Sequence, residues 1–494
     1  MVTNWGLKPI FHEERLILTQ AFHEDGHLPE CLYRSGNNVY FKGRPLFRFT
    51  IQEGRIVVVG NRERVIERIR RAEQLECDMR EHLNRTFSAN RSVLASLNDE
   101  AISFVRVSGE RFRDKERFIS FSGGKDSTVT AVIVKRALGQ VPMLFCNTTI
   151  ELPETVDYVH DFAEWIGLRL IELTPRKDFC ELMRDLGPPS RMMRWCCFTQ
   201  KSAPINDYLK KFNQGVISYD GIRRAESMAR MKYDRQHENT KITKQTSIYP
   251  LLEWSDLAVW LFLLNEGVPF NRAYRWGLSR VGCWACPNEG KISAFFLELQ
   301  HPEMFRRWQM QLEEFAMTNG KDESWVKDGE WKKRRAAYQY SESAMKTQLC
   351  GQGRDFIYRL KNREIDKDMI NFLAIFGDME EGLNGSDNLV KIAGAEIDIS
   401  TFFGSKEIMV HLTGDNGHDV LRLLEKQIEK GMNCIKCGAC VGSCSRGAIS
   451  VDEGFHIDKS HCTSCLICAR GIFLKQSCTT IHYRRERNVI GAAT

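Results

Sequence analysis

The sequence predicts an α/β protein with a parallel sheet in its central part. Between about Lys115 and Gly290, apolar segments (FISFS, PMLFCN, LRLIEL and GVISYDGI) alternate with stretches of helical character. Strands that alternate with helices in this way are typical of parallel sheets. A β-rich region precedes this part of the chain, and a tail dense in cysteine and glycine follows it.

The regions outside the sheet indicate further segments. Residues 38–60 alternate apolar and polar residues around turn signals, which predicts short antiparallel strands, and the charged stretch 62–97 predicts a helical linker. We therefore expect a β-rich module with its linker over residues 1–95 and the α/β domain over 96–345. A connecting α+β element is expected over 346–428 and a cysteine-rich domain over 429–494.

Composition restricts the class of protein. The 494 residues are 43% hydrophobic and 27% charged, as in ordinary folded proteins, and the net charge of +6 permits an anionic partner without requiring one. The chain has 17 cysteines, an odd number that fits a secreted disulfide framework poorly. We expect most of them to bind metal in a reducing compartment.

Targeting signals are not apparent. Residues 1–18 carry charges and lack the apolar core of a signal peptide, and no stretch reaches the ~18 apolar residues of a membrane helix. The apolar run Leu257–Leu264 is short and predicts a buried core helix. We expect a cytoplasmic protein without a membrane partner.

A phosphate-binding loop is the strongest motif. Residues 118–128 read FISFSGGKDST, so that a strand leads through two glycines into a helix. Adjacent glycines let backbone N–H groups approach an anion, the start of a helix favours phosphate, and Lys125 adds a positive charge. The spacing differs from G-x-x-x-x-G-K-[ST], which disfavours simple ATP hydrolysis coupled to motion. A tight strand–helix turn without a ligand is the alternative.

This segment resembles the PP-loop motif SGGxDS, with which ATP pyrophosphatases hold pyrophosphate. Residues 147–155 (NTTIELPET) and 221–230 (GIRRAESMAR) resemble segments of phosphoadenylyl- and adenylyl-sulfate reductases, as do 249–260 and 282–287 (GCWACP). The segments follow one another in the family's order. The resemblance implies that the core of the α/β domain is a PP-loop sheet of the adenine nucleotide alpha hydrolase-like type.

The resemblance also implies a site for ATP, with Mg²⁺. Arginine side chains suit phosphate or sulfate oxygens, and open α/β sheets bind ligands at strand ends such as Asp220-Gly221. A solvated surface is the alternative for Lys232, Arg235 and Lys241. Catalytic roles are expected for Lys125, Asp126, Arg223, Arg224 and Arg230. Binding of the nucleotide is expected for Ser120, Ser122, Gly123, Gly124, Lys125, Asp126, Ser127, Asn147, Glu151, Gly221 and Glu226.

A first set of metal ligands is split along the chain into Cys196-Cys197 and Cys283-x2-Cys286. Four thiolates suit either zinc or an iron–sulfur cluster, and unligated core cysteines are a further alternative. Adenylyl-sulfate reductases and the PP-loop enzymes of DNA phosphorothioation carry a 4Fe–4S cluster at this arrangement. The resemblance therefore favours a cluster.

The cysteine-rich tail carries a second and a third set of candidate metal ligands. Cys434-x2-Cys437-x2-Cys440-x3-Cys444 has the bacterial ferredoxin spacing, which predicts a two-cluster ferredoxin-like domain. The second run departs from the pattern, because position 472 is Ile and the next cysteine is Cys478. In two-cluster ferredoxins the fourth cysteine of each run serves the other cluster. That rule gives Cys434, Cys437, Cys440 and Cys478 for one cluster, and Cys462, Cys465, Cys468 and Cys444 for the other.

The expected total is three 4Fe–4S clusters, of which the two in the tail form a path for electrons. A zinc ribbon and a purely structural role are the alternatives for the tail. Five cysteines receive no metal role: Cys31, Cys77, Cys146, Cys180 and Cys350. His23, His27 and Cys31 are not expected to form a metal site, because Gly26 and Pro29 interrupt any helix that would align them. Cys350 is a candidate persulfide carrier, against a plain loop cysteine.

The motifs together predict an ATP pyrophosphatase of sulfur metabolism. The resemblance is nearest to the DndC and SspD type of DNA phosphorothioation proteins. It implies that ATP adenylates a backbone phosphate of DNA and that sulfur from a cysteine desulfurase, or another sulfur donor, displaces AMP. Basic segments at 332–335 and 484–487 are candidates for contact with DNA, against a solvated surface as the default for each, and other modification proteins would be partners.

Three alternatives remain. The first is a ferredoxin-linked reductase of adenylyl sulfate or phosphoadenylyl sulfate, against which stands the lack of the Glu-Cys-Gly-Leu-His segment of those enzymes. The second is a tRNA-thiolating PP-loop enzyme. The third is a non-catalytic iron–sulfur scaffold that binds a nucleotide.

Overall fold

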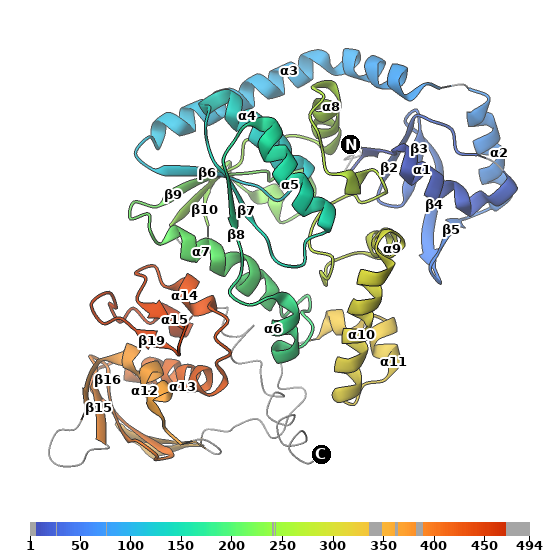
Figure 1. The fold of residues 1–494 in the computed structure, drawn as a ribbon. Coiled ribbons are helices and arrows are strands. Elements are labelled where there is room, and N and C mark those ends of the chain that lie inside the picture. The colour runs from blue at the N-terminus through green and yellow to red at the C-terminus, as the bar shows by residue number, and fades with distance from the viewer. Residues whose placement is uncertain are drawn as a thin grey trace. The chain divides into compact units, whose positions relative to one another are not determined.

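The computed structural model describes residues 6–470, except positions 26, 76, 240, 241, 243, 335–347, 361–363 and 382–388. The chain divides into two compact units (Figure 1). The first unit comprises Met1–Leu173, Phe212–Thr240 and Lys244–Gln309, and the second comprises Thr174–Lys211, Lys241–Thr243 and Met310–Thr494. Among the described helices, none combines the length and the apolar character needed to cross a membrane.

The first unit begins with an antiparallel sheet of five strands in the order β1-β2-β3-β4-β5. Helix α1 (His12–Thr19) lies between its first two strands in the chain. Phe22, Val39 and Phe49 are fully buried in the core of this module. The strands predicted over residues 38–60 are confirmed. The bounds are β1 (Lys8–Pro9), β2 (Leu32–Ser35), β3 (Asn38–Phe41), β4 (Arg44–Gln52) and β5 (Arg55–Val59).

The segment predicted to be a helical linker is helical and consists of two helices. Asn61 caps α2 (Arg62–Glu73), and Asp78 caps α3 (Met79–Arg111) by accepting a 2.7 Å hydrogen bond from the backbone N–H of Glu81. Figure 1 shows α3 as one long helix. It runs through position 95, so the domain boundary expected there falls inside a helix. The reason is that α3 packs on α4 (Lys125–Leu138) and α8 (Asp256–Asn265) of the α/β core.

The core of the first unit is a six-stranded sheet in the order β10-β11-β9-β6-β7-β8. All neighbours are parallel except the edge strand β10. The four apolar segments of the sequence form β6, β7, β8 and β9, which confirms the α/β class with a parallel-sheet core. The bounds are β6 (Glu116–Ser120), β7 (Met143–Cys146), β8 (Leu170–Leu173), β9 (Val216–Asp220), β10 (Gln236–Glu238) and β11 (Gln245–Ile248).

The strand register brings three loops to one edge of this sheet. Ser120 at the end of β6 is paired with Asp220 at the end of β9 on one side and with Leu144 of β7 on the other. The chain runs outward from β6 through β7 to β8 and then returns to place β9 on the other side of β6. The phosphate loop therefore lies where the strand order reverses, the usual ligand position in open α/β sheets.

Helices complete the first unit. Helix α8 (Asp256–Asn265) is the buried apolar helix that the sequence predicted, and its N-cap residue is Ser255. Helix α10 begins in the first unit and ends in the second. The remaining helices are α4 (Lys125–Leu138), α5 (Pro153–Ile166), α9 (Lys291–Gln300) and α10 (Pro302–Thr318).

The second unit contains an antiparallel six-stranded sheet in the order β12-β13-β17-β16-β15-β14. Cys350 lies in β12 in register with Ile357 of β13. The bounds are β12 (Gln348–Gln352), β13 (Asp355–Arg359), β14 (Asp378–Glu381), β15 (Leu389–Ala393), β16 (Ile397–Phe402) and β17 (Glu407–Leu412).

Short helices and a hairpin form the rest of the second unit. Helix α13 crosses position 428, so the expected start of the cysteine-rich domain also falls inside a helix. The described helices that lie wholly in the second unit are α6 (Phe179–Leu186), α7 (Ala203–Leu209), α11 (Glu323–Lys327), α12 (Lys367–Leu373), α13 (Gly417–Asn433), α14 (Ala439–Ser443) and α15 (Ile467–Arg470). The hairpin pairs β18 (Ile449–Ser450) with β19 (His456–Ile457).

Candidate functional site

The phosphate loop links β6 to α4 and is held from within. Gly123 has a φ of +69°, and a Cβ atom there would lie 2.8 Å from the Thr155 side chain, so both backbone shape and space require glycine. The Ser127 hydroxyl donates to the carbonyl of Gly124 at 2.9 Å and accepts from the backbone N–H of Ser122 at 3.3 Å. The Ser122 side chain remains exposed, so the loop offers a preformed surface.

A closed network of four charges lies at the start of α4. The Lys125 ammonium lies 2.7 Å from Asp126 Oδ2 and 2.9 Å from Asp256 Oδ1. The Arg223 guanidinium donates from Nε to Asp126 Oδ1 at 2.6 Å and from Nη2 to Asp256 Oδ1 at 2.7 Å. Two cations thus meet two carboxylates, and the formal charges cancel.

Burial determines what this network does. Lys125 and Arg223 are 5% and 1% exposed. Burial by itself raises the pKa of Asp126, but the charges of Lys125 and Arg223 outweigh it and hold that pKa below its ordinary value. The two cations predicted to contact phosphate are therefore engaged with carboxylates, and Arg223 positions Asp126 and Asp256 from inside the protein.

Two members of this site were missed by the sequence analysis. Asp256 completes the network, and the Tyr274 hydroxyl accepts a 3.0 Å hydrogen bond from the backbone N–H of Lys125. A signal for Asp256 was present, because residues 249–260 were recognised as a motif. The motif alone did not reveal which charge Asp256 would meet.

Gly221 has a steric role. A Cβ atom at this position would lie 2.6 Å from the backbone carbon of Asp126 and 2.7 Å from the backbone nitrogen of Ser127. Only glycine lets the end of β9 approach the start of α4 this closely. This contact brings the arginine segment that follows Gly221 to the phosphate loop.

The outer arginines differ from Arg223. Arg224 lies 3.2 Å from Glu253, and Arg230 forms an ion pair with Glu226, which also accepts from the backbone N–H of Arg223. Burial lowers the pKa of Arg230, and the nearby charge of Arg280 lowers it further. Arg280, a single residue in a loop, was not found by sequence reasoning. Two like charges that interact in this way favour a nearby anion.

The loop after β7 brings predicted nucleotide and cysteine residues together. Asn147 shapes the loop by accepting from the N–H of Thr149 and donating to Glu172 at 2.9 Å. Glu151 accepts a 2.7 Å hydrogen bond from the Thr148 hydroxyl and lies 3.6 Å from the sulfur of Cys283. The carboxylate of Glu151 therefore links the two predicted sites within the first unit.

The other members of the first cysteine set are divided between the two units. Cys286 follows Cys283 in a turn closed by a 3.2 Å backbone hydrogen bond between the two residues. Cys196 and Cys197 belong to the second unit, where a π-helical segment begins at Cys197.

The two cysteine runs of the tail share one backbone shape. Lys436 and Ser464, each two residues after the first cysteine of a run, have φ values of 57° and 48°. Gly438 and Leu466, each two residues further along, have φ values of 76° and 58°. Left-handed conformations cost non-glycine residues about 1–2 kcal/mol each, and such bends turn backbone N–H groups towards an anionic group. The N–H of Lys436 donates to the sulfur of Cys434 at 3.4 Å.

Four cysteines of the tail surround one largely apolar cavity. They are the four that the ferredoxin rule assigned to a single cluster: Cys444, Cys462, Cys465 and Cys468. Burial raises the pKa of the Cys468 thiol to about 11, and the neighbouring Cys440, Cys444 and Cys465 act in the same direction. Four thiol ligands around one cavity fit the donor set of an iron–sulfur cluster.

A buried lysine accompanies these cysteines. Lys430 of α13 is fully buried, and its ammonium lies 4.3 Å from the centre of the Phe455 ring. Its charge opposes the rise in the pKa of Cys468. Cys437 and Cys440 of the other set are buried, whereas Cys478 lies outside the described residues.

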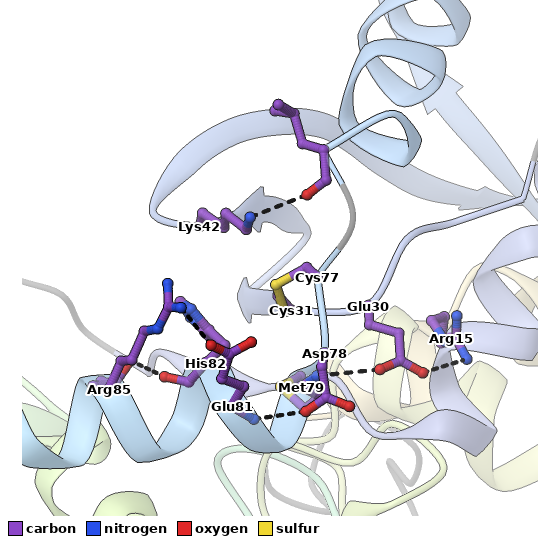
Figure 2. The surroundings of a disulfide bond; sticks show 12 residues. Arg15, Glu30, Cys31, Lys42, Cys77, Asp78, Met79, Glu81, His82 and Arg85 are labelled. Carbon is purple, nitrogen blue, oxygen red and sulfur yellow. Dashed lines mark hydrogen bonds and ion pairs between the residues drawn. A yellow bond between two sulfur atoms is a disulfide. The ribbon is translucent and has the colours of Figure 1, made fainter.

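Two expectations need correction. Cys31 and Cys77, which received no role, form a disulfide with their Cα atoms 6.2 Å apart (Figure 2). The sequence analysis judged a disulfide framework a poor fit and missed this pair, because a fold contact joins cysteines 46 positions apart. In the basic segment 332–335, Arg334 is buried and donates to the carbonyl of Leu186 at 2.7 Å, so it is not a surface contact for DNA. Residues 484–487 lie outside the described residues.

Comparison with known proteins agrees with the motifs. Residues 116–289 match the family model of the phosphoadenosine phosphosulfate reductase domain. This match supports the family that the sequence motifs indicate. It includes the phosphate loop, the arginine segment and the Cys283-x2-Cys286 motif, whereas the cysteine-rich tail lies beyond it.

The chain is also similar to individual proteins. It is 34% identical over 246 residues to an uncharacterized protein of Methanocaldococcus jannaschii, covering 49% of this chain and 51% of that protein. The chain thus spans about half the length of this relative. It is 28% identical over 193 residues to the adenosine 5'-phosphosulfate reductase of Streptomyces coelicolor, covering 38% of this chain and 77% of the enzyme. The solved phosphoadenylyl-sulfate (PAPS) reductase from Candida auris has a TM-score of 0.31 and 18% identity, covering 39% of this chain and 95% of that one.

The charge network predicts a dependence of stability on pH. The pKa of Asp126 is lower in the folded chain than its ordinary value of 3.8, so the stabilisation is present above that value and is lost as the pH falls towards the folded pKa. Asp126→Asn should lower the free energy of unfolding at pH 7 by about 3–5 kcal/mol and flatten its fall below about pH 4. Urea denaturation between pH 7 and pH 3 measures both effects.

The matched control is Asp157→Asn, which removes an exposed carboxylate of α5. This variant should change the free energy of unfolding by less than about 0.5 kcal/mol. Equal effects of the two substitutions, or the same acid slope in Asp126→Asn and the unaltered chain, would contradict a stabilising network.

Proposed function

We propose that the chain is an ATP pyrophosphatase of sulfur metabolism, in which ATP activates an acceptor oxygen for replacement by sulfur. The observation that carries this proposal is the glycine loop, with the exposed side chain of Ser122, beside a charge-neutral buried network. Lys125 and Arg223 are neutralised by carboxylates, so the proposal assigns the pyrophosphate to the loop N–H groups, to Arg280 and to Arg230, which would exchange its ion pair with Glu226 for phosphate oxygens.

The first step is transfer of the adenylyl group. An acceptor oxygen attacks the α-phosphorus of ATP, the bond from that phosphorus to the bridging oxygen breaks, and pyrophosphate leaves. The loop over Ser122–Ser127 binds the leaving pyrophosphate, and Arg230 with Arg280 stabilises the charge that develops on it. Mg²⁺ bound with ATP would neutralise further charge. The chain itself mainly positions the reactants.

The second step introduces sulfur. With DNA as the acceptor, the terminal sulfur of a persulfide from a cysteine desulfurase attacks the activated phosphorus, and AMP leaves. Two electrons and one proton then cleave the sulfur–sulfur bond, which gives the phosphorothioate and the thiol of the donor. Iron–sulfur clusters, when bound, would carry these two electrons from an external low-potential reductant. Cys283 and Cys286 in the first unit, Cys196 and Cys197 in the second, and the tail cysteines would hold them.

A second candidate function is reduction of adenylyl sulfate to sulfite and AMP with two electrons. The similarity of the chain to the adenosine 5'-phosphosulfate reductase of Streptomyces coelicolor favours it. The same loop and arginines would hold the nucleotide and its sulfate. The fused cysteine-rich tail would provide electrons in place of an external thiol donor.

Product analysis of the anaerobically purified chain separates these functions. With ATP, Mg²⁺, DNA and a persulfide donor, the proposal predicts AMP and pyrophosphate in equal amounts. Arg230→Gln should lower kcat/KM by about 100-fold, whereas the exposed Lys232→Gln should have little effect. Sulfite release from adenylyl sulfate, without ATP turnover, would replace the proposal with the second function. Replacement of DNA by tRNA tests a thiolated RNA product, and lack of any turnover with intact clusters would indicate a scaffold.

The proposed cofactors predict an iron content. Three 4Fe–4S clusters give about twelve iron and twelve acid-labile sulfide atoms per chain. Cys465→Ser, which alters one of the cavity cysteines, should remove about four of each, and the exposed Cys180→Ser should remove none. Metal and sulfide analysis of the two variants measures this. A content of about eight in the unaltered chain would exclude the cluster at Cys196, Cys197, Cys283 and Cys286.

A further inference from the structure

The Cys31–Cys77 disulfide has a third possible metal ligand beside it. The two sulfurs and a ring nitrogen of His82 all lie within 4.8 Å of one another. Figure 2 shows His82 on the first turn of α3, next to the sulfur pair. The three residues come from the chain before β2, the link between α2 and α3, and α3 itself. They lie outside the phosphate loop and the cysteine sets described above.

This donor set has the chemistry of a zinc ligand set. Two cysteines and one histidine are zinc ligands in many proteins, and three protein ligands leave the fourth tetrahedral position to water. A disulfide uses the two sulfurs alone and does not require an imidazole beside them. We propose that the reduced chain binds a zinc ion through Cys31, Cys77 and His82, and that the disulfide is the oxidised, metal-free form of the same site.

Atoms and electrons balance in the change from the disulfide form to the zinc-bound form. A dithiol reductant breaks the sulfur–sulfur bond, becomes a disulfide itself, and leaves two electrons and two protons on the cysteine sulfurs as thiols. Zinc then binds the two thiolates and the neutral imidazole, and the two protons go to solvent. In the reverse direction a disulfide oxidant takes the two electrons and, with two protons from solvent, becomes a dithiol, while the Cys31–Cys77 disulfide forms and the zinc ion is released.

The surrounding contacts hold the donors near one another without the disulfide. The Glu30 carboxylate accepts a 3.2 Å hydrogen bond from the backbone N–H of Met79, which ties the residue before Cys31 to the start of α3. Lys42 donates to the carbonyl of Leu75 at 3.2 Å, and the Tyr33 ring packs edge-on against His82. Reduction therefore leaves the ligands close together. The zinc ion would join the N-terminal sheet to α3, which packs on α4 behind the phosphate loop.

Zinc analysis of the full chain purified anaerobically with a reductant tests this proposal. The unaltered chain should hold about one zinc ion that is lost in Cys77→Ser. His82→Ala should weaken zinc binding at least about tenfold, and His82→Cys should restore it. X-ray absorption at the zinc edge should give two sulfur neighbours at about 2.3 Å and one nitrogen neighbour at about 2.0–2.1 Å.

Matched controls separate this site from other thiols and histidines. Cys180→Ser and His237→Ala alter exposed residues outside it and should retain the zinc. A persistent disulfide without zinc in the reduced preparation overturns the proposal. So does a zinc content that is the same in Cys77→Ser or His82→Ala as in the unaltered chain. The experiment needs no nucleotide and no turnover, so its outcome is independent of the proposed function.

Discussion

The buried ion network of Lys125, Asp126, Arg223 and Asp256 is the constraint on which the site depends. It joins the start of α4, the segment after β9 and the start of α8, so three parts of the chain meet at one point. Removing two cations and two carboxylates from water is costly unless every charge is paired, and here each cation contacts both carboxylates. Because the four charges cancel, the network adds no net charge beside the loop. It therefore neither attracts nor repels a charged ligand strongly.

The geometry around this network explains the placement of the outer residues. Gly221 allows β9 to end against α4, and the chain then turns into the arginine segment. The loop after β7 ends at the same edge of the sheet and carries Glu151 to Cys283. Nucleotide and cysteine residues therefore approach one another because parallel strands end together, not because they are neighbours in sequence.

Local patterns in the sequence predicted the elements, and contacts between distant segments decided the rest. The strands β6 to β9 follow from apolar runs, and the loop follows from its glycines. Asp256 and Arg280 were missed because each interacts with a charged residue that is distant in the sequence, Lys125 for Asp256 and Arg230 for Arg280. The Cys31–Cys77 disulfide and the burial of Arg334 were missed for the same reason, since both depend on contacts between distant segments. Helices α3 and α13 continue through positions 95 and 428, where the sequence analysis expected domain boundaries, because each has packing partners further along the chain.

In the cysteine-rich tail, the sequence indicated the ligand pattern, but it did not predict the local backbone conformation. The cysteine spacing indicated two equivalent runs, and the structure gives both the same unusual backbone turns, although three of the four residues that adopt them are not glycine. No propensity rule predicts a left-handed lysine, serine or leucine. Such residues are retained where the surrounding structure or a ligand compensates their cost.

Competition between ATP and inorganic pyrophosphate tests the central claim most directly. The claim is that the glycine loop with its outer arginines is a pyrophosphate site beside a neutral network. Calorimetric titration of the full chain with ATP and Mg²⁺ should show that pyrophosphate displaces ATP, and Arg230→Gln should weaken both ligands by about tenfold, or about 1.4 kcal/mol. ATP binding that is unaffected by pyrophosphate and by this substitution would contradict the account.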